Sequence, residues 1–183
     1  MEVLQADDIR HLRTASAEYG KTERLKGQLQ SVRASRDPFL LTSDELDLIF
    51  RWKLRGQYER TQRRRAMNTP AVYEAVTEAV FKVVDPSPDY EATVRLGLLT
   101  ALPGIGVPVA SAVLALADPQ RYCVIDFRGW RAVFRSARTV FLVPEYLRYR
   151  TEVAKLASQL GWTVQETDLA IWEYDRRQEH GVA

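Results

Sequence analysis

Apolar side chains recur at helical spacing along most of the chain. In residues 70–84 they fall three or four positions apart, which predicts a helix with one buried face. Residues 107–117 contain no charged side chain, so we expect this helix to be buried on most of its sides. The same pattern predicts further helices over residues 5–19, 22–35, 43–54, 89–101, 126–137, 144–160 and 163–178.

Capping residues mark where several of these helices begin. Thr42 stands three residues before Glu45, which is the spacing of a capping box. Thr163 and Glu166 repeat this spacing before the last helix. The run Thr139–Val143 is β-branched and apolar, and we expect it to be extended but outside any sheet. The sequence therefore predicts an all-α fold with eight or nine helices and almost no strand.

The length and composition of the chain limit the number of domains, whereas its net charge does not identify a binding partner. The chain has 183 residues, of which 46% are hydrophobic, and this fits a single compact domain over residues 1–183. Such a domain is either undivided or built as two small lobes that share a core. The net charge of +2 is mildly basic and does not by itself indicate a nucleic-acid partner.

Cysteine and histidine usage narrows the chemistry. Cys123 is the single cysteine, so the chain cannot form an internal disulfide, and we expect a reducing cytoplasm. One cysteine also excludes a four-cysteine iron–sulfur site. His11 and His180 are far apart in sequence, so we expect no metal site and no required cofactor. The N-terminus lacks the pattern of a signal peptide, and no apolar run reaches the length of a membrane span.

A two-glycine hairpin separates the helices predicted over 89–101 and 107–117. Gly104 and Gly106 permit a tight turn and a close approach of the backbone to a ligand. The N–H groups of Gly106, Val107 and Val109 are then expected to point outward at a positive helix end, which suits a phosphate. A plain corner between two helices, without any ligand, would give the same pattern.

The run Leu102-Pro-Gly-Ile-Gly106, followed by Ala110, resembles the hairpin of the helix-hairpin-helix motif. In that family the hairpin binds a DNA phosphate through backbone amides. The resemblance implies that residues 104–107 supply these amides here, with Ile105 between the two glycines. A monovalent cation is often held by hairpin carbonyls. The resemblance implies a compact helical fold of two lobes with a cleft between them, and residues 89–135 carry it best.

The run Val124-Ile-Asp126 resembles a second part of the same superfamily, the HhH-GPD base-excision DNA glycosylases. Asp126 falls in the position of their catalytic aspartate, and Arg131 in that of a following arginine. The 18 positions from Pro108 to Asp126 (126 − 108) match the family's spacing from its lysine to its aspartate. The resemblance implies that Asp126 stabilises positive charge on the sugar or activates water. Alternatively, Asp126 only caps a helix.

Two departures from the family pattern limit the expected chemistry. Pro108 stands where bifunctional members carry a nucleophilic lysine, and proline has no amine to form a Schiff base. Any glycosylase activity is therefore expected to be monofunctional, with water as the nucleophile. Arg128 stands where the family often has histidine or asparagine.

The segment from Arg51 to Arg65 concentrates seven basic residues with one glutamate. Trp52 and Tyr58 interleave with the basic side chains, and together they could neutralise and stack on nucleic acid. A solvated helix face would look the same. The candidate DNA contacts in this segment are Arg51, Lys53, Arg55, Arg63 and Arg64.

A second set of arginines follows Asp126. Arg128, Arg131 and Arg135 share one helix face by their spacing. We interpret Arg128 and Arg131 as a second phosphate-binding strip or as partners that keep Asp126 ionised. Solubility of the helix is the alternative.

These patterns leave three functional hypotheses open. The first is a monomeric protein that binds duplex DNA, resembles an HhH base-excision glycosylase and hydrolyses an N-glycosidic bond. The second is a binding module of the same fold without catalysis. The third directs the basic cleft at another ligand, such as a nucleotide or an acidic protein. None of the three involves a membrane.

Overall fold

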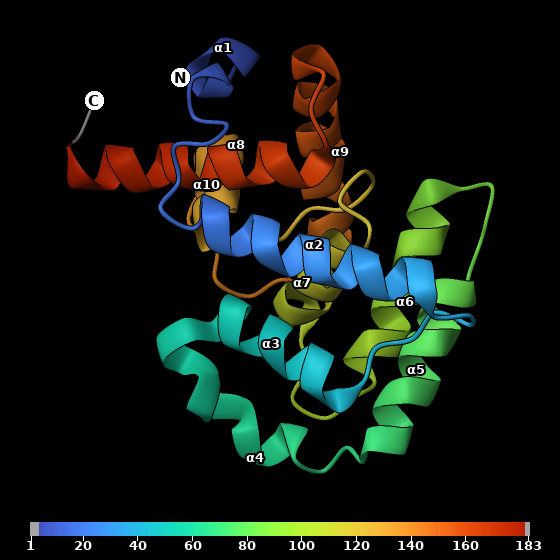
Figure 1. The fold of residues 1–183 in the computed structure, drawn as a ribbon. Coiled ribbons are helices and arrows are strands. Elements are labelled where there is room, and N and C mark those ends of the chain that lie inside the picture. Colours follow the sequence, from blue (N-terminus) through green and yellow to red (C-terminus); the bar gives the residue numbers. More distant parts are fainter. Residues whose placement is uncertain (1–3, 182–183) are drawn as a thin grey trace.

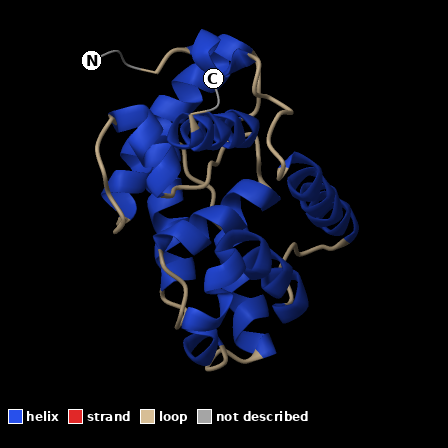
Figure 2. Cartoon of the chain, turned by 90° about the vertical axis from the view of Figure 1, so that its left-hand side faces the viewer, coloured by secondary structure: helices blue, strands red, loops and turns tan. Residues whose placement is uncertain are grey.

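The computed structural model describes residues 4–181, in which helices are joined by loops and turns and no strand occurs (Figures 1 and 2). The predicted all-α class is confirmed. The elements are α1 (Ala6–Arg10), α2 (Tyr19–Ser35), α3 (Ser43–Leu54), a 3₁₀ helix η1 (Arg55–Thr61), α4 (Gln62–Arg65), α5 (Pro70–Lys82), α6 (Pro88–Thr100), α7 (Val107–Ala117), α8 (Phe127–Phe134), α9 (Val143–Leu160) and α10 (Val164–His180).

Helix α7 lies at the centre of the molecule (Figure 1). Every residue of α7 except Pro108 is buried, as the absence of charge predicts. Four helices pack around it, namely α2, α3, α6 and α9. A helix surrounded in this way can bury all its sides, because each side meets another apolar surface rather than water.

The remaining helices pack in two groups around this centre. Helix α10 contacts α8 and α9, and α1 packs on α9 and α10. On the other side α5 contacts α3 and α6, while η1 and α4 follow directly on α3. Among the helices of residues 4–181, none is both long enough and apolar enough to cross a membrane.

Most predicted helix starts are confirmed, and the differences have local causes. Thr42 and Thr163 both cap their helices in complete capping boxes. The helix expected over 5–19 ends at Arg10, and a turn follows in which the N–H of Leu12 donates to the carbonyl of Ile9 and the Leu12 side chain is buried. Helix α8 ends at Phe134, three residues before the expected end, since Arg135 adopts a left-handed conformation with φ of 52°.

Candidate functional site

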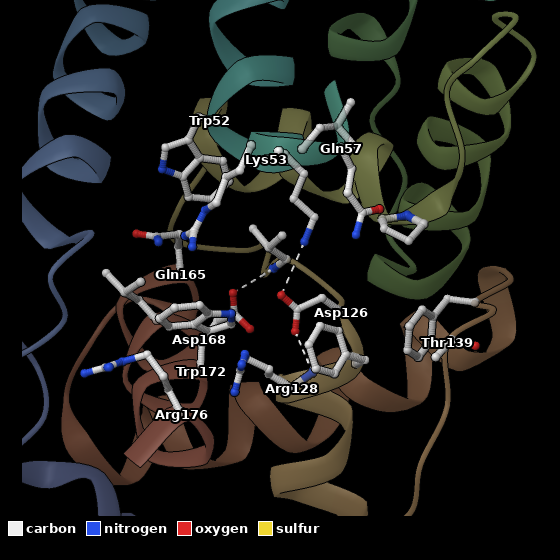
Figure 3. A pocket seen from close by; sticks show the side chains of 18 of the residues that line it. Trp52, Lys53, Gln57, Asp126, Arg128, Thr139, Gln165, Asp168, Trp172 and Arg176 are labelled. Carbon is white, nitrogen blue, oxygen red and sulfur yellow. Dashed lines mark hydrogen bonds and ion pairs between the residues drawn. The ribbon is translucent and has the colours of Figure 1, made fainter. Parts of the chain in front are cut away.

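A cleft of about 1130 Å³ opens between α3 with η1 on one side and α8 with α10 on the other (Figure 3). It is large enough for a nucleoside, since small-molecule pockets commonly span about 300–1,000 Å³. Besides arginines, three ionisable side chains from distant parts of the chain line it. They are Lys53 of α3, Asp126 before α8, and Asp168 of α10.

Asp126 divides its two carboxylate oxygens between the fold and the cleft. Oδ1 accepts hydrogen bonds of 3.0 Å from the backbone N–H groups of Arg128 and Gly129, so the side chain caps α8. Oδ2 lies 3.5 Å from Nζ of Lys53. The side chain is 23% exposed and lines the cleft. Asp126 therefore caps α8, as one interpretation of the sequence expected, and also faces the cleft, where the expected catalytic role stays a prediction.

Lys53 reaches the cleft from the end of α3. Its Nζ donates to the backbone carbonyl of Ile125 at 3.3 Å and pairs with Asp126, and only 10% of the side chain is exposed. The sequence groups Lys53 with surface residues that would contact DNA. The structure instead places it beside Asp126, because the last turn of α3 faces the segment before α8.

Asp168 is a site residue that sequence reasoning missed. It is 6% exposed, and its oxygens accept hydrogen bonds from the hydroxyl of Tyr149 at 2.6 Å and from the backbone N–H of Val124 at 3.0 Å. Burial, followed by the charge of Asp126, raises the pKa of Asp168 to about 7, although the two hydrogen bonds and Lys53 act in the opposite direction. In the sequence Asp168 is only one of several acids on the last helix.

The raised pKa of Asp168 predicts that the protein loses stability as the pH rises. Between the unfolded pKa of 3.8 and the folded pKa of about 7, the folded state holds a proton that the unfolded state has released. The contribution of Asp168 to the free energy of unfolding should therefore fall by about 3 kcal/mol between pH 5 and 8. Urea unfolding at both pH values measures this. The Asp168→Asn variant should show a flatter profile, and an equal slope in both proteins would contradict the assignment.

The hairpin between α6 and α7 is built on a type II turn. The N–H of Ile105 donates to the carbonyl of Leu102 at 3.1 Å, and Gly104 has a φ of 83° that such a turn requires. The N–H groups of Gly106 and Val107 donate to no acceptor within residues 4–181. The N–H of Val109 donates to the carbonyl of Gly106 at 3.0 Å, so this amide is not free for a phosphate.

Helix α4 lies directly against this hairpin. A Cβ atom on Gly104 would lie 2.8 Å from the backbone nitrogen of Arg65 and 3.1 Å from Cβ of Arg64. Asn68 donates to the carbonyl of Pro103 at 3.0 Å, so this carbonyl already has a partner. The described residues contain no group of three or more His, Cys, Asp or Glu side chains that could hold a metal ion.

The basic segment divides into paired and unpaired arginines. Arg51 pairs with Asp47 at 2.6 Å, and Arg55 lies 3.6 Å from Glu18. The exposed side chains of Arg63 and Arg64 have no ion-pair partner in the part of the chain that the structure describes. These two arginines therefore keep their charge available next to the hairpin.

The arginines of α8 are neutralised by the last helix. Arg131 binds Asp175 through two hydrogen bonds of 2.8 and 2.7 Å, and this pairing raises the pKa of Arg131. Arg128 pairs with Asp175 at 3.2 Å and with Glu179 at 2.6 Å. The structure therefore pairs Arg128 and Arg131 with carboxylates of α10, which neutralise their positive charge. They do not form a row of unpaired arginines to which a phosphate could bind.

The cleft thus combines an aspartate that caps α8, a lysine from α3 and a buried acid from α10. Outside the cleft, two arginines without ion-pair partners among the described residues lie on α4, next to the hairpin. Comparison of the chain with known proteins adds no relative to this description. No protein-family model matches the chain, and neither the search of curated proteins nor that of solved structures found a match.

Proposed function

We propose that this protein binds duplex DNA through the hairpin and α4, and that it hydrolyses an N-glycosidic bond in the cleft. The proposal includes a two-lobed helical fold of the HhH-GPD type. One observation carries it: Asp126 has one oxygen held by two backbone N–H groups and the other directed into a cleft that a nucleoside can enter.

Two features support DNA binding at the hairpin. The N–H groups of Gly106 and Val107 are unused at the N-terminus of α7, where the helix dipole favours an anion. Arg63 and Arg64 lie on the adjoining helix α4, are exposed and lack ion-pair partners among the described residues. Amides that fix a phosphate and arginines that neutralise its neighbours form a common arrangement at DNA backbones.

The cleft supplies electrostatic stabilisation for hydrolysis. As the bond between C1′ and the base breaks, positive charge develops on the sugar, and a fixed carboxylate nearby lowers the barrier. Pro108 lines the cleft and has no amine. Nζ of Lys53 is engaged by the Asp126 carboxylate at 3.5 Å and by the carbonyl of Ile125 at 3.3 Å, and the proposal assigns it no attack on the sugar. Water is therefore the nucleophile in this proposal.

One observation favours the non-catalytic alternative. The ammonium group of Lys53 lies 3.5 Å from Oδ2 of Asp126 and offsets the negative charge that hydrolysis needs. A binding module of the same fold could use this ion pair only to hold α3 against α8. Release of bases from a panel of lesion-bearing duplexes, by the wild type and by Asp126→Asn, separates the two functions.

The proposed DNA surface predicts a defined salt dependence. Each phosphate contact adds about 0.9 to the slope of log K against log salt concentration, so replacing Arg63 and Arg64 by alanine should lower the slope by about 2. Fluorescence anisotropy with a labelled duplex at several salt concentrations measures this slope. A matched control replaces the exposed residues Arg10 of α1 and Lys155 of α9, two helices in the upper part of Figure 1, whereas α4 lies at its bottom. Equal slopes in the two double variants would argue against the surface.

A further inference from the structure

The cleft holds a second carboxyl group whose surroundings differ from those of Asp126. Figure 3 shows Asp126 and Asp168 side by side, the first from the start of α8 and the second from α10. The Asp126 carboxylate has an ionic partner in Lys53 and is 23% exposed. Asp168 is 6% exposed and has no ion-pair partner among the described residues.

The groups around Asp168 favour its neutral form. Four titratable side chains face it: Tyr149 from α9, Asp126 before α8, Lys53 from α3, and the buried thiol of Cys123. Burial and the negative charge of Asp126 together outweigh Lys53 and the two hydrogen-bond donors, so the pKa of Asp168 rises to about 7. A carboxylic acid with such a pKa can donate a proton at neutral pH.

Two hydrogen bonds orient the carboxyl group of Asp168. Its Oδ1 accepts one from the hydroxyl of Tyr149, and its Oδ2 accepts one from the backbone N–H of Val124. No other hydrogen bond from a described residue reaches these oxygens, and the side chain lines the cleft. The acid proton can therefore be presented to a molecule in the cleft, beside the carboxylate of Asp126.

We propose that Asp168 is the general acid of the cleft and protonates the departing base while the Asp126 carboxylate stabilises the sugar. The proposal rests on the glycosidic hydrolysis proposed above. The bond between C1′ and the base nitrogen breaks with its electron pair going to the base, and the base accepts the proton of Asp168. Water then adds to C1′ and releases a proton to Asp126, and proton exchange with solvent restores both carboxyl groups. The sum is addition of one water molecule across the glycosidic bond.

The two carboxyl groups define a class of substrate. A neutral base leaves as an anion unless it is protonated, so its departure gains from an acid. A base that already carries a positive charge, such as 7-methylguanine, leaves as a neutral molecule and needs no proton. The cleft is therefore suited to neutral bases, and Asp168 distinguishes them from cationic ones.

Single-turnover base release by full-length protein tests this role. The substrates are duplexes that carry one neutral base (uracil, hypoxanthine or ethenoadenine) or one 7-methylguanine. We expect wild-type protein to release a neutral base and Asp168→Asn to lower that rate by at least about 100-fold, with less than about 5-fold loss on 7-methylguanine. A purely structural role would lower both rates alike. That equal loss, or release of 7-methylguanine alone by the wild type, would overturn the role of Asp168.

The Tyr149→Phe variant gives a second readout with little change in shape. It removes the hydroxyl that donates to Asp168, and this hydrogen bond lowers the pKa of the acid. The alkaline limb of the rate profile for the neutral base should therefore move to higher pH, and a limb that stays in place or moves to lower pH would contradict the proposal. At pH 6 the infrared spectrum of the wild type should show a carboxylic-acid band that is absent from the spectrum of Asp168→Asn.

Failure of the two proposals can be told apart. If wild-type protein releases a base from no duplex in the panel, the proposal of glycosidic hydrolysis is wrong, and so is the role of Asp168 that depends on it. If bases are released and Asp126→Asn abolishes the release while Asp168→Asn does not, hydrolysis stands and only the proton donor is wrong.

Discussion

The Asp126→Asn variant should release bases from duplex DNA at least about 100-fold more slowly than the wild type, with unchanged affinity for DNA. Asparagine caps helices about as well as aspartate, so its oxygen can keep the hydrogen bonds from Arg128 and Gly129. The negative charge directed into the cleft is lost, and loss of one preorganised electrostatic group commonly costs this much in rate. Single-turnover rates and anisotropy titrations on the same duplexes measure both quantities.

A matched control separates the charge of Asp126 from its ion pair. Lys53→Gln breaks the same 3.5 Å contact but leaves the carboxylate in the cleft. We expect this variant to remain at least about 10-fold more active than Asp126→Asn, because the carboxylate supplies the electrostatic stabilisation. If both variants lose activity equally, the ion pair acts by holding the cleft together. If Asp126→Asn stays fully active, the carboxylate is only a helix cap.

The Gly129→Ala variant should destabilise the protein by about 2–5 kcal/mol. A Cβ atom at Gly129 would lie 2.2 Å from the hydroxyl oxygen of Tyr149, whose side chain is fully buried. Either α8 must shift or the ring must move, which adds the cost of overpacking to that of a buried hydrogen bond lost at Asp168. Urea unfolding at pH 6 measures the change in the free energy of unfolding.

Two further variants control for the effect of alanine at Gly129. Gly97 lies in α6, and a Cβ atom added to it would meet no atom of another segment within 4 Å, so Gly97→Ala should stabilise the protein by about 0.5–1 kcal/mol. In a Tyr149→Phe background the hydroxyl is absent, and Gly129→Ala should cost less than it does in the wild type. An equal cost in both backgrounds would show that the hydroxyl is not the source of the clash.

Local patterns in the sequence predicted most of the fold. The uncharged run 107–117 predicts a buried helix, and α7 is buried at the centre of the molecule. The capping boxes at Thr42 and Thr163 place helix starts correctly, because capping depends on residues only three positions apart. The short helices η1 and α4 were not predicted, since their polar and basic residues have no apolar period.

The cleft could be predicted only in part, because its contacts join distant segments. Asp126 was found through a local motif, and its side chain accepts from the backbone N–H groups two and three residues further along the chain. Its partner Lys53 is 73 positions away, and Asp168 meets Val124 across 44 positions. No periodicity or spacing in the sequence encodes such pairings. The same holds for Asp175, which meets Arg131 through the packing of α10 on α8.

The lack of a side chain at Gly104 has a consequence for the rate of the proposed association with DNA. It lets α4 rest on the hairpin, so the backbones that carry the free amides and Arg64 are fixed to each other before any ligand arrives. No segment has to fold on contact, and little conformational entropy is lost. Encounter with DNA should then proceed as rigid docking, at a rate set by diffusion and charge rather than by rearrangement of the protein.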